Sequence, residues 1–310
     1  MSDPAIYGRD LFGEVVRPKP SGVVARRFIV PPFSVLDARS GTWQERKRAW
    51  RTTGLRGEVG RSAPVHSNEW AKAKGLSGCG STMATDYTSI FDPVLCELVY
   101  RWFCPPAGQV IDPFAGGSVR GLVASALGLR YWGCDLRAEQ IDANRAQARD
   151  LAADPLPLWV VGDSSREIVN SPGADLLFTC PPYGDLERYS DDPADLSAMT
   201  WGAFLDAYRA IIASSVSRLR DHRFACIVVS DIRDRQGNYR NLVGETVAAY
   251  EATGCRLYNE AVILDALGSA AMRVTRYFQT SRKLVRVHQK LLVFVKGDNR
   301  RAADACKGLR

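Results

Sequence analysis

From about residue 85 onward, short hydrophobic runs typical of buried β-strands alternate with longer segments of helical periodicity. Strands are predicted at residues 109–115, 130–136, 158–163, 174–182, 224–232, 256–264 and 288–297. This alternation is typical of a doubly wound α/β fold with a parallel sheet. No helix is predicted between the last two strands, so they are most simply antiparallel. We therefore expect a Rossmann-like sheet of seven strands, mostly parallel with one reversed strand.

Charge and periodicity divide the chain into parts. Residues 1–80 carry 14 Lys and Arg against 7 Asp and Glu and show little periodicity apart from one short helix, which predicts a basic N-terminal arm. Residues 81–298 form one predicted domain, in which 266–287 are a basic loop, and 299–310 are a basic C-terminal tail. The segment between the basic ends is acidic. Such a charge distribution suits a nucleic acid, because Arg and Lys contact phosphates, although basic tails can also be merely solvated.

Cysteine spacing and hydropathy exclude several classes of protein. The eight cysteines never form a C-x-x-C pair and lie among hydrophobic residues, so reduced core thiols are predicted, with no disulfide framework and no metal site. No apolar run approaches the roughly 18 residues of a spanning helix, and the first residues lack the apolar core of a signal peptide. We expect a cytoplasmic protein with no membrane partner. Its oligomeric state is not indicated.

The first predicted strand leads directly into a glycine-containing turn. The segment reads Asp112, Pro113, Phe114, Ala115, Gly116, Gly117, Ser118. Glycines let a ligand approach the backbone at the carboxyl end of the sheet, where doubly wound folds bind ligands. The turn lacks both G-x-G-x-x-G and Gly-Lys-Ser/Thr, which disfavours a dinucleotide or a phosphate. An acid ahead of the turn favours a ligand with a cationic group.

Acidic residues also end the next two predicted strands. Asp135 ends the strand at 130–136, in a position suited to a ribose diol, and Asp163 with Ser164 follows the third strand. Each is also a preferred type of helix N-cap, which is the structural alternative. Three acids at successive strand ends suit one ligand with an amine, a ribose and an adenine. S-adenosyl-L-methionine has all three groups.

The fourth predicted strand ends in Thr179, Cys180, Pro181, Pro182 and Tyr183. An exocyclic base amine is a poor nucleophile, so a site must hold it with two acceptors and aim its lone pair. Consecutive prolines stiffen a turn and leave the first carbonyl open to such an amine. A tyrosine beside it can stack on a base that has left the duplex. A simple strand terminator with a core tyrosine is the alternative.

The turn DPFAGGS and the sequence TCPPY together resemble the cofactor turn and the catalytic D/N/S-P-P-Y motif of S-adenosylmethionine-dependent DNA amino-methyltransferases. The chain looks most like phage-encoded members. The resemblance covers residues 85–297 and implies a methyltransferase domain, S-adenosyl-L-methionine as cofactor, DNA as partner, and the cytoplasm of a bacterial or phage-infected cell, as in restriction-modification. TCPPY is nearest to the Ser-Pro-Pro-Tyr version, which implies cytosine N4 ahead of adenine N6.

The resemblance also assigns roles to residues. Cofactor binding is expected of Tyr87, Thr88, Asp112, Pro113, Phe114, Gly116, Gly117, Ser118, Asp135, Leu136, Asp163 and Ser164. Asp112, Phe114 and the glycines would shape the methionine and ribose pocket, Asp135 would hold the ribose, and Asp163 with Ser164 would face the adenine. The catalytic group is Cys180, Pro181, Pro182 and Tyr183.

Cys180 departs from the family pattern. A thiol is a weaker acceptor than Ser, Asp or Asn, so it would hold an amine less firmly. A thiolate could instead add to cytosine C6 and activate C5, although enzymes of that kind place the nucleophile after a proline, and this chain reads Cys-Pro-Pro-Tyr. The motif is also compatible with an enzyme that modifies RNA, or with a DNA-binding protein that has lost its activity.

Basic and aromatic residues alternate between the last two predicted strands. Such a mixture suits a nucleic-acid backbone with unstacked bases. Residues expected to bind nucleic acid are Arg273, Arg276, Arg282, Lys283 and Arg286, together with Arg233 in the charged loop after the fifth strand. That charged loop is equally compatible with a local cluster of salt bridges.

Overall fold

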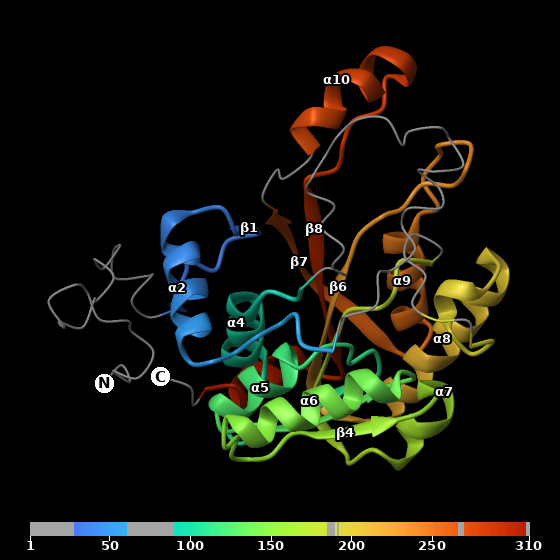
Figure 1. The fold of residues 1–310 in the computed structure, drawn as a ribbon. Helices are drawn as coiled ribbons and strands as arrows, with labels where there is room; N and C mark the ends of the chain where they lie inside the picture. The colour runs from blue at the N-terminus through green and yellow to red at the C-terminus, as the bar shows by residue number, and fades with distance from the viewer. Residues whose placement is uncertain (1–27, 61–89, 185–189, 191, 266–269, 308–310) are drawn as a thin grey trace, which may run out of the picture.

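The structure is a computed structural model that describes residues 28–60, 90–184, 190, 192–265 and 270–307 (Figure 1). Its strands are β1 (Val35–Asp37), β2 (Gln109–Asp112), β3 (Arg130–Asp135), β4 (Leu158–Val161), β5 (Ala174–Thr179), β6 (Leu219–Val229), β7 (Cys255–Leu264) and β8 (His288–Lys296). Its α-helices are α2 (Gly41–Thr52), α4 (Pro93–Phe103), α5 (Val119–Ala126), α6 (Ala138–Asp150), α7 (Ser164–Glu167), α8 (Trp201–Arg218), α9 (Leu242–Glu251), α10 (Ala270–Ser281) and α11 (Asn299–Ala305).

The strands form one sheet in the order β1-β7-β8-β6-β5-β2-β3-β4. Neighbours are parallel except where β8 pairs antiparallel with β6 and β7. After the edge strand β1, the chain enters the sheet near its middle at β2, moves out to β4, and returns to build the other half from β5, which makes the sheet doubly wound. The predicted Rossmann-like sheet, mostly parallel with one reversed strand, is confirmed, and β1 adds a strand to the seven that were expected.

Helices cover both faces of this sheet. One core cluster joins α2, α4, α5 and α6 to one face, and it contains Trp43, Val99, Val123 and Trp159. The other cluster joins α8 and α9 to the opposite face, with Phe204, Tyr208 and Tyr250 among its buried rings. The central strands β2 and β5 are buried along their whole length, as expected of parallel strands covered on both sides. The result is a three-layer sandwich that leaves the two ends of the sheet open.

The start of α4 shows how the sequence fixes a helix boundary. Asp92 is the N-cap and its carboxylate accepts a hydrogen bond from the Val94 N–H at 2.9 Å. Pro93 occupies the first helical turn, where a missing N–H costs nothing. This cap also brings Asp92 and the preceding Phe91 to the carboxyl end of the sheet.

Part of the predicted basic arm belongs to the folded domain. β1 pairs in parallel with β7, and α2 packs on α4. The buried Glu97 of α4 accepts hydrogen bonds from Arg46 and, at 2.9 Å, from the Trp50 indole. Burial raises the pKa of Glu97, but the hydrogen bond and charge of Arg46 outweigh it and hold the pKa below its usual value. The sequence pattern missed this docking because the partners of Arg46 and Lys47 lie 51 and 45 positions further along the chain.

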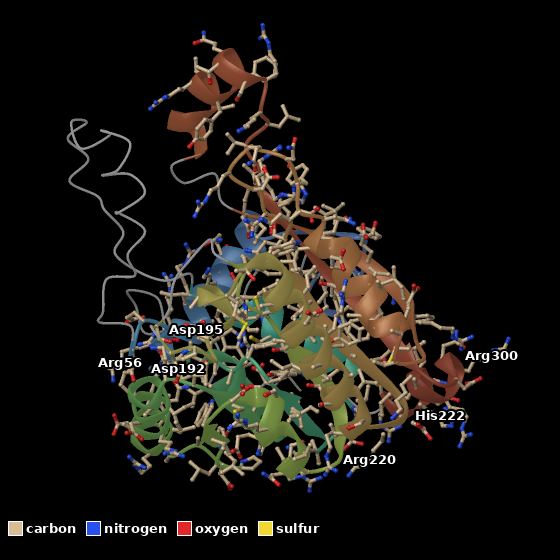
Figure 2. The ribbon with its side chains drawn as sticks, turned by 90° about the vertical axis from the view of Figure 1, so that its right-hand side faces the viewer. Arg56, Asp192, Asp195, Arg220, His222 and Arg300 are labelled. Carbon is tan, nitrogen blue, oxygen red and sulfur yellow. The ribbon has the colours of Figure 1, made fainter. Side chains whose placement is uncertain are left out.

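The basic segment between β7 and β8 was expected to be a loop, and that expectation is wrong for residues 270–281. They form α10, and both views show it projecting away from the sheet (Figures 1 and 2). The segment contains no Gly or Pro, and the spacing of Val274, Tyr277 and Phe278 gives it an apolar stripe. β7 and β8 pair antiparallel, as predicted, but the segment that joins them contains a helix.

Candidate functional site

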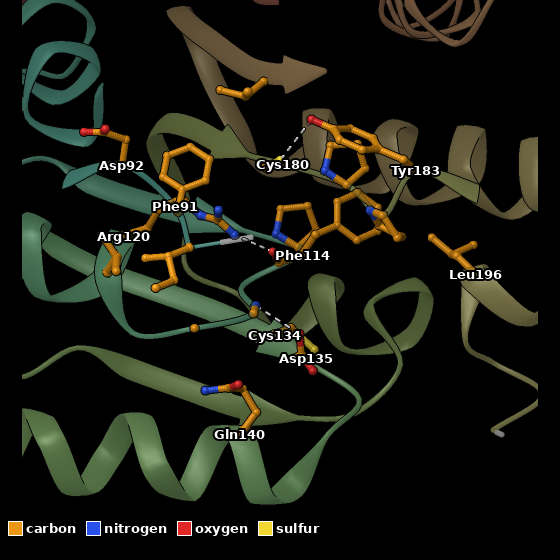
Figure 3. Close-up of a pocket in the computed structure, with 18 of the residues that line it drawn as sticks. Phe91, Asp92, Phe114, Arg120, Cys134, Asp135, Gln140, Cys180, Tyr183 and Leu196 are labelled. Atoms are coloured by element: carbon orange, nitrogen blue, oxygen red, sulfur yellow. Dashed lines mark hydrogen bonds between the residues drawn. The ribbon is translucent and has the colours of Figure 1, made fainter. Parts of the chain in front are cut away.

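A cavity of about 320 Å³ opens at the carboxyl ends of β2, β3 and β5. It is lined by most of the residues that the sequence singled out: Pro113, Phe114, Gly116, Gly117, Asp135, Leu136, Asp163, Ser164, Cys180, Pro181, Pro182 and Tyr183. In Figure 3, Phe114 lies between Asp135 on one side and the Cys180–Tyr183 pair on the other. The two predicted halves of the site, cofactor turn and catalytic turn, therefore share one cavity.

The glycine turn has the conformation that this role requires. Gly116 has φ of 50°, a left-handed value that favours glycine, and a Cβ there would meet nothing within 4 Å. Its N–H donates to Asp135 Oδ2 at 2.9 Å, and its carbonyl accepts from Asn144 Nδ2 at 2.8 Å. Two hydrogen bonds thus hold the backbone of Gly116 in place, and the space beside its Cα is open.

Asp135 keeps acceptor capacity for a ligand. The partly buried carboxylate accepts the backbone N–H groups of Gly116 and, at 3.0 Å, of Arg137. A carboxylate has about four acceptor positions, so about half remain. Burial raises the pKa of Asp135, while the two backbone hydrogen bonds oppose that rise. Donors from a bound ligand would lower its pKa again.

Asp163 and Ser164 follow β4, the third of the strands predicted from the sequence. Asp163 acts as a helix N-cap, which was the structural alternative to ligand binding. Its carboxylate caps α7 by accepting the N–H of Ser165 at 2.8 Å and the hydroxyl of Ser165 at 2.7 Å. The Ser164 hydroxyl donates to the carbonyl of Pro113. This bond ties the third strand end to the glycine turn, and both residues still line the cavity.

Asp112 and Ser118 do not line the cavity, and the expectation that they contact a ligand requires correction. The buried Asp112 carboxylate accepts hydrogen bonds from Arg120 Nε (2.5 Å), Tyr131 (2.7 Å) and Thr179 (2.5 Å). The buried Ser118 hydroxyl accepts from Gln147 Nε2 at 2.9 Å. Asp112 therefore joins β2, β3, β5 and α5 behind the cavity, and the cation that it binds is an arginine of this chain.

Arg120 is a cavity residue that the motifs did not indicate. It donates to Asp112 and also, through the same guanidinium, to the carbonyls of Phe114 and Ala115. It lies 4.6 Å from the centroid of the Phe91 ring (Figure 3). Arg120 follows Asp112 by eight residues, and this spacing is not a recognised sequence motif. The pairing of the two side chains therefore depends on the fold.

The catalytic turn continues directly from β5. Thr179 is fixed by Asp112, and Cys180 Sγ lies 3.7 Å from the Tyr183 hydroxyl. That hydroxyl donates to Gln289 Oε1 at 3.2 Å. The turn therefore presents the Pro181 carbonyl region and the tyrosine ring to the same cavity, with the ring anchored at its far end.

The wall opposite the cofactor turn was not anticipated from the sequence. It includes Trp43 and Lys47 of α2, Asp92, and Asp265 and Gln289 at the ends of β7 and β8. Lys47 Nζ is 2.8 Å from Asp92 Oδ2. These residues come from segments far apart in sequence, so none of them forms a local motif.

Two of the basic residues expected to bind nucleic acid, Arg233 after β6 and Arg286 before β8, lie at the end of the sheet where the cavity opens. The guanidinium carbons of Arg233 and Arg286 lie 3.9 and 4.9 Å from the centroid of the Tyr239 ring. Arg286 also pairs with Asp231 at 3.5 Å, so the salt-bridge alternative applies to that residue. Arg276 and Arg282 are exposed on and just after α10, and Lys283 is partly exposed.

Three predicted residues are not placed by the structure. Tyr87 and Thr88 lie outside the described residues, and the side chain of Arg273 does as well. Among the described residues, no group of three or more His, Cys, Asp and Glu side chains is arranged to hold a metal ion. In the same part of the chain, no helix has the length and apolar character to cross a membrane.

A second charged group lies far from the cavity. Arg220 pairs with Asp175 at 2.5 Å, and His222 Nδ1 accepts the N–H of Asp298 at 3.0 Å. Figure 2 shows Arg220, His222 and Arg300 on the opposite side of the molecule from Asp195, which lines the cavity. These contacts connect strand ends and have no access to the site.

Comparison with known proteins gives a likeness of fold only. No family model matches the chain, and no curated protein matches it. Among solved structures, TrmN from Thermus thermophilus has a TM-score of 0.45 at 15% identity over 66% of this chain, and the chain spans 49% of TrmN. A TehB-like SAM-dependent methyltransferase from Corynebacterium glutamicum has a TM-score of 0.42 at 18% identity, covering 74% and 98% of the two chains. Magnesium protoporphyrin IX methyltransferase from Synechocystis, with bound SAH, has 0.45 at 10%, covering 74% and 95%.

Proposed function

We propose that the protein transfers a methyl group from S-adenosyl-L-methionine to an exocyclic base amine in DNA, with cytosine N4 ahead of adenine N6. The observation that supports this most is the shared cavity, which has the glycine turn and Asp135 on one side and Cys180, Pro181 and Tyr183 on the other. A methyl transfer needs the methyl donor and the base amine in one enclosed site. The resemblance of DPFAGGS and TCPPY to amino-methyltransferase motifs supports the same function.

The cavity residues fit this cofactor. S-adenosyl-L-methionine supplies an activated methyl group on a sulfonium sulfur. Asp135 retains acceptors for a ribose diol, the open space above Gly116 admits a ligand close to the backbone, and Leu136 and Phe114 provide apolar surface for an adenine. Asp163 and Ser164 lie at the next strand end along this wall.

The catalytic turn would hold and orient the target base. Its Pro181 carbonyl accepts one amine hydrogen, which fixes the nitrogen with its lone pair toward the methyl donor. The Tyr183 ring stacks on the base, which must leave the duplex to enter the cavity. Hydrogen-bond acceptors around the amine also stabilise the positive charge that develops on it.

A nucleic acid would reach the cavity across the basic segments at the same end of the sheet. Arg276, Arg282 and Lys283 contribute the charge, and the Arg233–Tyr239–Arg286 stack contributes a flat aromatic and cationic surface. Contacts of this kind bind phosphates and stack on bases without reading sequence. We propose that this surface positions DNA so that one base can turn into the cavity.

Replacing Asp135 by alanine is expected to weaken S-adenosyl-L-methionine binding by roughly 10- to 150-fold, because charge-assisted hydrogen bonds of about 1.5–3 kcal/mol are lost. Since burial raises the pKa of Asp135, affinity in the parent should also fall as the pH is lowered through that raised pKa, where the carboxylate becomes protonated. Isothermal calorimetry at several pH values measures both effects. Equal affinity in the variant and the parent would show that the ribose does not lie at Asp135.

Replacing Arg276, Arg282 and Lys283 together by glutamine should weaken DNA binding and reduce the slope of log affinity against log salt by about 2–3, close to one unit per lost phosphate contact. A matched triple variant, with Arg300, Arg301 and Lys307 of the α11 segment replaced by glutamine, removes the same charge from a segment whose Arg300 lies across the molecule from the cavity residue Asp195 (Figure 2). Its slope should stay near that of the parent. Equal slopes for both triple variants would refute a phosphate-binding role for the α10 segment.

A further inference from the structure

Gln289 occupies a defined place on the wall of the cavity opposite the cofactor turn. It is the second residue of β8 and lies beside Ile263 of β7 in the sheet register. Because β8 runs antiparallel to its neighbours, its first residues are at the carboxyl ends of β6 and β7. The antiparallel direction of β8 therefore places Gln289 in the cavity with Cys180 and Tyr183. Asp265, which follows β7 at the same end of the sheet, lines the cavity as well.

The orientation of the Gln289 amide is fixed by its two partners. Its Oε1 accepts the Tyr183 hydroxyl at 3.2 Å, and the Asp265 carboxylate lies in the same cavity, close enough for the Gln289 amide to oppose the rise in the pKa of Asp265 that burial causes. A donor on one side and an acceptor on the other allow only one of the two amide orientations. A primary amide has two acceptor positions and two N–H donors, so one of each remains on Gln289.

Because the Cys180 thiol is a weak acceptor, a second good acceptor is needed for the amine, and the Gln289 amide can supply it. An amine with developing positive charge requires two good acceptors, and a thiol sulfur is a weak one. The Cys180 sulfur is 3.7 Å from the Tyr183 hydroxyl, whose proton goes to Gln289 Oε1. Gln289 is thus separated from Cys180 by a single hydroxyl group, and both line the cavity.

Resting on the proposed function, we propose that Gln289 binds the target base, with Oε1 accepting the amine hydrogen that Cys180 holds only weakly and Nε2 donating to the adjacent ring nitrogen. Asp265 is a positioning residue that keeps the amide in this orientation. The pairing suits cytosine (N4 amine, N3 acceptor) and adenine (N6 amine, N1 acceptor). It disfavours thymine, because thymine O4 would face Gln289 Oε1, which is also an acceptor, and thymine N3–H would face Gln289 Nε2, which is also a donor.

The test uses Gln289→Met, which keeps length and volume but removes the amide, together with Cys180→Ser and the double variant. Methylation is measured on DNA from a methylation-free host. Gln289→Met should lose roughly 10- to 100-fold in kcat, on the scale of a lost hydrogen bond to a charged group. Cys180→Ser, which supplies a better acceptor, should have a higher kcat than the parent, and in the Gln289→Met background it should restore at least about half of the loss on a logarithmic scale. No loss in Gln289→Met, or no rescue by serine, would overturn the proposal.

A binding measurement separates this proposal from the proposed function. Each protein, with S-adenosylhomocysteine present, is titrated with deoxycytidine, deoxyadenosine and thymidine and followed by ligand-observed NMR. The parent should prefer the first two nucleosides, Gln289→Met should lose that preference, and Asp265→Asn, whose amide can donate or accept, should weaken it. If the parent methylates no DNA but shows this pattern, only the proposed function fails. If all proteins bind the three nucleosides equally, the role of Gln289 fails even where DNA is methylated.

Discussion

Replacing Arg120 by methionine is expected to lower the free energy of unfolding by about 3–5 kcal/mol, the usual cost of leaving a buried charge without its partner. The Arg120 and Asp112 side chains are 6% and 0% exposed and 2.5 Å apart. Without the guanidinium, the Asp112 carboxylate keeps only the hydroxyl donors of Tyr131 and Thr179 and one backbone N–H. The carbonyls of Phe114 and Ala115 also lose their donor.

Urea denaturation of Arg120→Met, Asp112→Asn and the double variant measures this effect. The double variant removes both charges, so it should be destabilised by less than the two single losses combined. Cofactor affinity should fall with stability in Arg120→Met, because the pair holds the glycine turn. A loss below about 1 kcal/mol, the scale of an exposed ion pair, would show that the Asp112–Arg120 pair is not the support of the site.

Replacing Tyr183 by alanine is expected to reduce methylation of DNA by roughly 5- to 150-fold, since stacking of a base on an aromatic ring contributes about 1–3 kcal/mol. The loss should appear in both KM for DNA and kcat, because the ring holds the base only after it has left the duplex. Tyr183→Phe keeps the ring and removes the hydroxyl that binds Gln289, so its loss should be smaller.

S-adenosyl-L-methionine affinity is the control for both tyrosine variants. Asp135, which accepts the Gly116 N–H, is on the other side of Phe114 from Tyr183 (Figure 3), so calorimetry should give parent-like affinity. An alanine variant that methylates DNA as fast as the parent would exclude stacking of the target base on Tyr183. Loss of cofactor affinity in the same variant would place the ring against the cofactor instead of the base.

The sheet and the position of the site could be predicted because their signals are local in sequence. Each central strand is a short apolar run, and residues at or just after the strand ends line the cavity, as with Asp135 at the end of β3 and Cys180 after β5. Parallel strands place such ends at one edge, so adjacency follows from the fold class alone. The reversed strand was also predictable, because β7 and β8 are the last two strands and adjacent strands in sequence most simply pair antiparallel.

The remaining features depend on partners distant in sequence. Asp112 was expected to meet a ligand, but Arg120 and Tyr131 already satisfy it, and no local pattern marks that pairing. The docking of α2 depends on Glu97. Gln289 is an ordinary polar residue at a strand start until β8 brings it beside Tyr183. Helix α10 was missed for a different reason, since the basic residues within and just after it outweighed its apolar stripe in the sequence pattern.

The proposed methylation of a base amine in DNA is tested most directly by the nucleoside composition of DNA from a methylation-free host that expresses the protein. Hydrolysis and mass analysis should give N4-methylcytosine, or N6-methyladenine if the target is adenine, with the signal much reduced for Tyr183→Ala. DNA that contains 5-methylcytosine, or no methylated base with a folded and cofactor-binding protein present, would contradict the claim.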